Sequence, residues 1–198
     1  MHRRMELRFE ALTGAALQPW LPALARLRIA VFRDWPYLYK GDRRAEARYL
    51  RDYSRAEGAC VVLALDGGRA VGASTCEPMA GAHGWAREDF AAAGRDPAQY
   101  CYFGESVLLP RYRGQGAGVR FFEMREAHAR GLGLPRATFC AVRRNSADPR
   151  RPAGYAPLDG FWRNRGYAPS GIACTLPWRE TGARGEAPHV LDFWERAL

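Results

Sequence analysis

A glycine-rich stretch in the middle of the chain, RYRGQGAGVRFF at residues 111–122, is the part of the sequence best suited to hold an anion. It follows an apolar run that stops at Pro110, and it precedes residues with helical spacing. A strand that turns through glycines into a helix leaves several backbone N–H groups unpaired at the positive end of the helix dipole. Such groups bind phosphate, so we interpret the stretch as a phosphate-binding loop.

The spacing of the glycines decides which phosphate ligand the loop fits. The Walker pattern GxxxxGK[ST] fails because the loop has no lysine. The dinucleotide pattern GxGxxG fails because its last glycine would be Val119, and the nucleophile-elbow pattern GxSxG fails because its last glycine would be Leu108. The pattern that remains is an arginine, two residues, a glycine, one residue and a glycine, at Arg113, Gly116 and Gly118.

A second segment further along the chain completes a recognisable pair of motifs. VLLPRYRGQGAGVRFF resembles the acetyl-CoA signature of the GNAT family of N-acetyltransferases, in which a strand, a Pro-x-Tyr-Arg-Gly turn and a helix hold the pyrophosphate of coenzyme A. LDGFWRNRGY, with its aromatic pair, basic segment and Gly-aromatic end, is similar to the second motif of that family. The two motifs stand in the expected order, and the resemblance covers residues 5–178.

The resemblance implies a donor and the groups that hold it. The donor would be acetyl-CoA, bound as a co-substrate without a metal. Backbone groups of Val107 and Leu108 would pair with the pantetheine arm like an added strand, and amides from Gly114 to Val119 would hold the pyrophosphate. The residues expected to contact coenzyme A are Val107, Leu108, Arg113, Gly114, Gln115, Gly116, Ala117, Gly118, Val119 and Asn145.

The implied reaction joins an amine to a thioester, so it needs a neutral amine, a stabilised oxyanion and a thiolate that can leave. An amine of lysine type has a pKa of about 10.4, which makes a base or a desolvated site useful. Glu105, late on the strand before the loop, is the expected base, because carboxylates at this place often contact the amine in the family. The alternative is that Glu105 pairs with an arginine.

The general acid is where the sequence departs from the family. A tyrosine often lies four residues before the glycine of the second motif, and here that position is Trp162. An indole N–H cannot usefully lose a proton, so Tyr155 is the expected catalytic substitute, with Tyr102 and Tyr167 as others and a packing role as the alternative for each. A thiol of pKa about 8.5 leaves without protonation, so activity can survive. The competing hypothesis is a protein that binds acyl-CoA as a sensor without transferring the acyl group.

The acceptor is expected at an aromatic loop, DWPYLYKGD, between the first two predicted helices. In the family this region borders the acceptor site, so Trp35, Tyr37 and Tyr39 would form a wall for the amine. Ordinary loop packing is the alternative. The expected partner is a small-molecule or peptide amine of unknown identity, and a homodimer is an arrangement that the sequence allows.

Hydrophobic periodicity supplies the elements that must position these groups. Residues 7–11 alternate like a half-buried strand, residues 20–31 have helical spacing, and Asp42 is placed to cap a second helix. CVVLALDGGRAVGAST predicts an antiparallel hairpin that turns at residues 66–68. The segment 80–98 is rich in small residues and has no strong period.

The second half of the chain alternates strands with single helices. YCYFGESVLL and RATFCAV predict strands on either side of a helix from Ala117 to Gly131, and GIACTLPW and residues 188–195 predict two closing strands. We therefore expect residues 1–198 to form one α/β (α+β) domain of acyl-CoA N-acyltransferase type. Its mixed, mostly antiparallel sheet would have about seven strands with helices on both faces.

The composition bears on the partners, the metal content and the location of the protein. The formal net charge of +9 favours an anionic partner, but the basic residues are spread along the chain, so nucleic-acid binding is not expected. The five cysteines are far apart and odd in number, which indicates small buried side chains in a reducing compartment rather than a metal site. No apolar run reaches the roughly 20 residues that span a bilayer, and we expect a cytoplasmic protein without a membrane contact.

Overall fold

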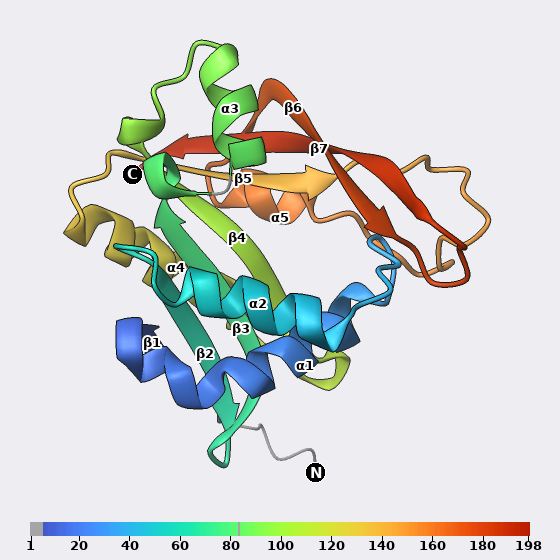
Figure 1. Cartoon of the computed structure of the whole chain (residues 1–198), viewed down its shortest axis with the longest axis horizontal. Coiled ribbons are helices and arrows are strands. Elements are labelled where there is room, and N and C mark those ends of the chain that lie inside the picture. Colours follow the sequence, from blue (N-terminus) through green and yellow to red (C-terminus); the bar gives the residue numbers. More distant parts are fainter. Residues whose placement is uncertain (1–5, 83) are drawn as a thin grey trace.

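The computed structural model describes residues 6–82 and 84–198, built around one sheet (Figure 1). Its seven strands lie in the order β1-β2-β3-β4-β5-β7-β6. Neighbouring strands are antiparallel, except that β4 and β5 are parallel, as the prediction of a mixed and mostly antiparallel sheet requires. The strands are β1 Arg8–Thr13, β2 Cys60–Asp66, β3 Arg69–Pro78, β4 Tyr100–Leu108, β5 Arg136–Val142, β6 Ala168–Arg179 and β7 Glu186–Ala197.

Helices cover both faces of the sheet (Figure 1). In β2, residues Cys60, Val62 and Ala64 pack towards α4, while Val61, Leu63 and Leu65 pack towards α1 and α2. A strand buried on both faces becomes a continuous apolar run, which explains the sequence CVVLALD. The α-helices are α1 Leu21–Phe32, α2 Arg43–Tyr53, α3 Gly84–Ala92, α4 Ala117–Gly131 and α5 Asp159–Asn164.

The predicted helix cap and hairpin turn are both present in the structure. Asp42 caps α2, since its Oδ1 accepts hydrogen bonds from the backbone N–H groups of Arg44 and Ala45 at 3.0 and 2.8 Å. Gly67 and Gly68 turn the β2–β3 hairpin with φ values of 54° and 82°. None of the helices in the described ranges is long and apolar enough to cross a bilayer.

Part of the segment 80–98, which had no clear period in the sequence, forms a helix. It contains α3, whose Ala86 and Phe90 are fully buried in a cluster with residues of β6 and β7. Phe90 packs edge-on against Tyr100, with ring centroids 4.7 Å apart. The helix has few apolar residues, so its sequence shows no clear period. Contacts of these few residues with distant strands hold it in place.

A β-bulge in β4 controls which face of the sheet its side chains reach. The pairs Ser74 with Ser106 and Cys76 with Phe103 differ in register by one residue, so Thr75 faces two residues of β4. These two residues are Gly104 and Glu105, and Glu105 donates its backbone N–H to Thr75 Oγ1 at 3.1 Å. Regular alternation would put Glu105 on the α4 side with Phe103, so the extra residue moves it to the α1 and α2 side.

The parallel strands β4 and β5 separate early. They pair only where Tyr100–Tyr102 meets Arg136–Thr138, and β5 then continues along β7. Beyond Tyr102, none of the described strands pairs with the edge of β4 that faces β5, so this edge is open to an extended ligand.

Candidate active site

The glycine-rich loop connects β4 to α4 and leaves a row of backbone amides without an acceptor. Gly114 and Gly116 have φ values of 73° and 87°, in the left-handed region that favours glycine. An added Cβ at either glycine would meet no atom within 4 Å. Within the described ranges, the N–H groups of residues 114–119 donate to no protein group. The loop therefore fits a pyrophosphate, which needs close backbone approach and several donors.

The two sequence motifs touch each other beside this loop. A Cβ on Gly118, in the first turn of α4, would lie 3.3 Å from Cζ of Phe161 in α5. Phe161 in turn packs edge-on against Phe122 of α4, with centroids 5.7 Å apart. Gly118 thus allows α5 to lie close to the start of α4, so its role includes helix packing.

The other residues predicted to contact coenzyme A lie on β4, in the glycine-rich loop and after β5. Val107 and Leu108 pair with β3 on one edge of the strand and lie beyond its pairing with β5 on the other, with Val107 buried and Leu108 half-buried. Arg113 is exposed and donates from Nε to the carbonyl of Leu108 at 3.1 Å, while Gln115 is exposed. Asn145 is exposed too, and its Oδ1 accepts from the N–H of Ala147 at 2.9 Å, so its contact with pantetheine stays a prediction.

Glu105 lies in a buried network with residues of α1 and α2. Arg28 Nη1 forms an ion pair with Glu105 Oε1 at 2.5 Å, and Arg28 Nε contacts Glu46. Tyr49 donates its hydroxyl to Glu105 Oε2 at 3.2 Å. The arginine pairing considered for Glu105 from the sequence is therefore present, and its role as a base stays a prediction.

A second carboxylate, Glu77 of β3, lies on the same face of the sheet and was not noticed in the sequence. It pairs in register with Tyr102, the last residue of β4 that is bonded to β5. Tyr102 contacts Cys140 of β5, with its hydroxyl oxygen 3.2 Å from Sγ. Burial raises the pKa of Glu77, and the charge of Glu105 raises it further, to about 7.

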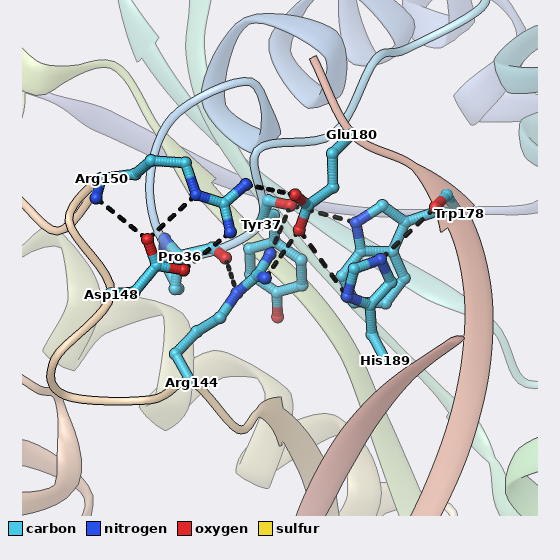
Figure 2. A network of polar contacts seen from close by, with 8 residues as sticks. All are labelled: Pro36, Tyr37, Arg144, Asp148, Arg150, Trp178, Glu180 and His189. Carbon is cyan, nitrogen blue, oxygen red and sulfur yellow. Dashed lines mark hydrogen bonds and ion pairs between the residues drawn. The ribbon is translucent and has the colours of Figure 1, made fainter. Parts of the chain in front are cut away.

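The aromatic loop after α1 is fixed by a network of charged residues (Figure 2). Arg144 donates to the carbonyl of Pro36 at 2.5 Å and to that of Tyr37 at 2.9 Å. The same guanidinium pairs with Glu180 at 2.6 Å, and Arg150 also contacts Glu180. Arg144 therefore joins the loop after α1 to Glu180, so three segments that are distant in the sequence are held together here.

The β6–β7 hairpin supports the same loop with backbone and ring contacts. Trp178 donates from Nε1 to the carbonyl of Tyr37 at 3.0 Å, and His189 stacks on Trp178 with ring centroids 3.7 Å apart. Lys40 donates its N–H to the carbonyl of Arg179 at 2.8 Å. The hydroxyl of Tyr37 takes no part in the network drawn in Figure 2.

The three residues predicted to border the acceptor, Trp35, Tyr37 and Tyr39, have different neighbours. Burial raises the pKa of Tyr37, and Cys140 and Glu105 add to the effect. Burial, followed by the charge of Glu46, raises the pKa of Tyr39 to about 12. Trp35 packs edge-on against Tyr155, with centroids 6.0 Å apart.

The tyrosines weighed as general acids have different surroundings. Tyr155 is half-buried beside Trp35, and burial raises its pKa, so it keeps its proton at neutral pH. Tyr167 lies in the core under α4 and donates to Glu126 at 3.1 Å. Trp162 packs against Phe139 and Trp194, with ring centroids 5.1 and 5.0 Å apart, so the structure gives it a packing position.

This arrangement is the acyl-CoA N-acyltransferase fold: a mixed sheet with an early separation of β4 and β5 and a glycine loop at the start of α4. The model of the Acetyltransferase (GNAT) family matches residues 24–151, more than half of the chain. The protein therefore belongs to the GNAT family.

Solved structures share the fold over nearly the whole chain. The ribosomal-protein-alanine N-acetyltransferase of Brucella melitensis is 18% identical, with a TM-score of 0.63 over 97% of this chain and 100% of that one. The Salmonella typhimurium protein yncA, solved with its cofactor acetyl-CoA, is 13% identical, with a TM-score of 0.58 over 98% and 94%. An acetyltransferase from Thermus thermophilus is 16% identical, with a TM-score of 0.55 over 98% and 99%. A search of curated proteins found no match.

Proposed function

We propose that the protein transfers an acetyl group from acetyl-CoA to a primary amine by direct attack in a ternary complex. The observation that carries this proposal is the row of free amides at residues 114–119, which lies beside the unpaired edge of β4. Coenzyme A would place its pyrophosphate on the amides and its pantetheine arm along Val107 and Leu108. Bound in this way, acetyl-CoA supplies the thioester carbonyl that the amine attacks.

The residues of the chain would orient the amine and exclude water. Glu105 and Glu77 attract a cationic amine to the face of the sheet below α1 and α2, where the charge of Arg28 is already paired. Trp35, Tyr37 and Tyr39 border this region as a mostly apolar wall that favours the desolvated amine. Tyr155 would donate a hydrogen bond near the leaving sulfur.

The enzyme hypothesis predicts release of free thiol from acetyl-CoA that depends on an added amine. A panel of amino acids, polyamines and peptides with a free N-terminus, assayed with a thiol reagent, would identify the acceptor class. No turnover above solvent hydrolysis on any amine would contradict the proposal. The packed position of Trp162 favours the second candidate, an acyl-CoA sensor, which would bind coenzyme A in calorimetry and still release no thiol.

A matched pair of glycine variants tests the coenzyme loop. Gly116 and Gly133 have φ values of 87° and 73°, and an added Cβ at either would contact no atom within 4 Å. Gly116→Ala and Gly133→Ala should therefore lower stability equally, by about 1–2 kcal/mol. Only Gly116→Ala should weaken coenzyme A binding, by about tenfold or more, because the strained loop no longer presents its amides to the pyrophosphate. Calorimetry with both variants measures this, and equal affinities would argue against the loop as the binding site.

A further inference from the structure

Glu77 differs from every other buried carboxylate in the described part of the chain. The residue is 5% exposed, and its side-chain carboxylate has no hydrogen bond or ion pair with any described residue. The other buried carboxylates, Glu46, Glu105 and Glu126, each contact at least one arginine. An isolated buried carboxylate is unfavourable for folding, so its presence at this place calls for a functional reason.

Strand pairing and a hydrogen bond to the preceding residue hold the backbone at Glu77 beside Glu105. Its register partner is Tyr102, at the point where β4 and β5 separate and where an acyl group carried along β4 would end. Tyr53 of α2 donates to the carbonyl of the preceding residue, Cys76, at 2.6 Å, which holds the backbone at Glu77. The bulge in β4 brings Glu105 to the same face of the sheet.

The titratable groups around Glu77 leave its carboxylate free to exchange a proton. Glu105 faces it from β4 and already has the positive charge of Arg28, while Tyr49 and Tyr53 face it from α2 and Tyr102 from β4. These three tyrosines keep their protons, since burial raises the pKa of each. A carboxylate whose own pKa is about 7 is half ionised at neutral pH, which suits a general base.

We propose that Glu77 is the catalytic base, contacting the ammonium group of the acceptor and removing its proton before attack. This inference rests on the proposed acetyl transfer. Glu105, held by Arg28, would then act as the fixed negative charge that attracts the ammonium group. Sequence position favoured Glu105 as the base, and the experiment below compares the two carboxylates directly.

The proton balance of the step is complete without another reactant. The Glu77 carboxylate takes one proton from the ammonium group and leaves a neutral amine. The amine nitrogen bonds to the thioester carbon, the carbon–sulfur bond breaks, and the second nitrogen proton goes to the thiolate, so coenzyme A leaves as the thiol. Glu77 finally returns its proton to water.

The test compares Glu77→Gln, Glu77→Asp and Glu105→Gln with the wild type on an amine that the wild type acetylates. Glu77→Gln should lower kcat at neutral pH by about tenfold or more and abolish the rise of kcat/KM with pH that is centred near 7. Glu77→Asp should keep part of that rise. Glu105→Gln should keep the rise but move it to lower pH, because the charge of Glu105 no longer raises the pKa of Glu77. It should mainly increase KM for the amine, while coenzyme A affinity stays unchanged in all three.

Two results would overturn the assignment of Glu77. One is an unchanged pH profile of kcat/KM in Glu77→Gln, because this variant has no carboxylate at residue 77 to accept the proton. The other is a carboxyl titration of Glu77 near its ordinary value in the wild type, followed by carbon NMR with Glu77→Gln as the assignment control. The NMR titration needs no substrate, so it tests Glu77 separately from the acetyl transfer. A wild type that acetylates no amine would overturn the proposed transfer, even where Glu77 titrates near 7.

Discussion

Replacing Arg28 by methionine should lower the free energy of unfolding by about 3–5 kcal/mol. The guanidinium pairs with Glu105 and Glu46. The side chain of Arg28 is 15% exposed, that of Glu105 7% and that of Glu46 3%, so water cannot replace the cation. Removing the cation leaves two buried carboxylates without a positive partner, and each must then bind a proton or stay charged in an apolar region. Urea denaturation at neutral pH measures the loss.

A control on the same helix separates this effect from helix propensity. Arg26 is exposed on α1, so Arg26→Met should change stability by less than about 0.5 kcal/mol. Adding Glu46→Gln and Glu105→Gln to Arg28→Met should recover most of the loss, because no buried charge remains. A single Arg28→Met variant as stable as the control would show that the pairing does not hold α1 to the sheet.

Stability should also depend on pH through Glu77. The pKa of Glu77 is raised in the folded protein from about 4.5 to about 7, so the folded state binds a proton more tightly than the unfolded chain does. As pH rises through this window the folded state loses that advantage, and Glu77 should lower stability by about 3 kcal/mol in total. The effect is absent below pH 4.5 and complete above pH 7.

The difference between two variants isolates this contribution from other carboxylates. Glu77→Gln should become more stable relative to the wild type as pH rises, and chemical denaturation at several pH values measures the change. Glu57→Gln makes the same substitution at an exposed position and should follow the wild type throughout. Parallel curves for Glu77→Gln and the wild type would mean that Glu77 is not strained by burial.

Signals close together in the sequence predicted the local structure well. The cap at Asp42, the turn at Gly67 and Gly68 and the glycine loop before α4 depend on neighbouring residues, so they are visible without the fold. Long-range pairing is different. That β7 lies between β5 and β6 depends on contacts between distant strands, and the sequence indicated only two closing strands.

The candidate site divides in the same way. The glycine-rich loop was predicted from one continuous stretch, whereas Glu77 lies near Glu105 through strand pairing opposite Tyr102 and the bulge opposite Thr75. No local pattern marks either feature. Arg28 did carry a signal, since it lies four residues after Leu24 on the apolar face of α1, where a charged side chain needs a buried partner.

The connection through Glu180 has a consequence for recombining segments between members of the family. Arg144 and Arg150, in the segment after β5, both contact Glu180 of the β6–β7 hairpin, and Arg144 also holds the loop after α1 through the carbonyl of Tyr37. Exchanging the segment after β5 alone with that of another family member would remove the arginine partners of Glu180 and the donor to the carbonyl of Tyr37. The three segments therefore form one exchangeable unit, and a chimaera should carry all of them or none.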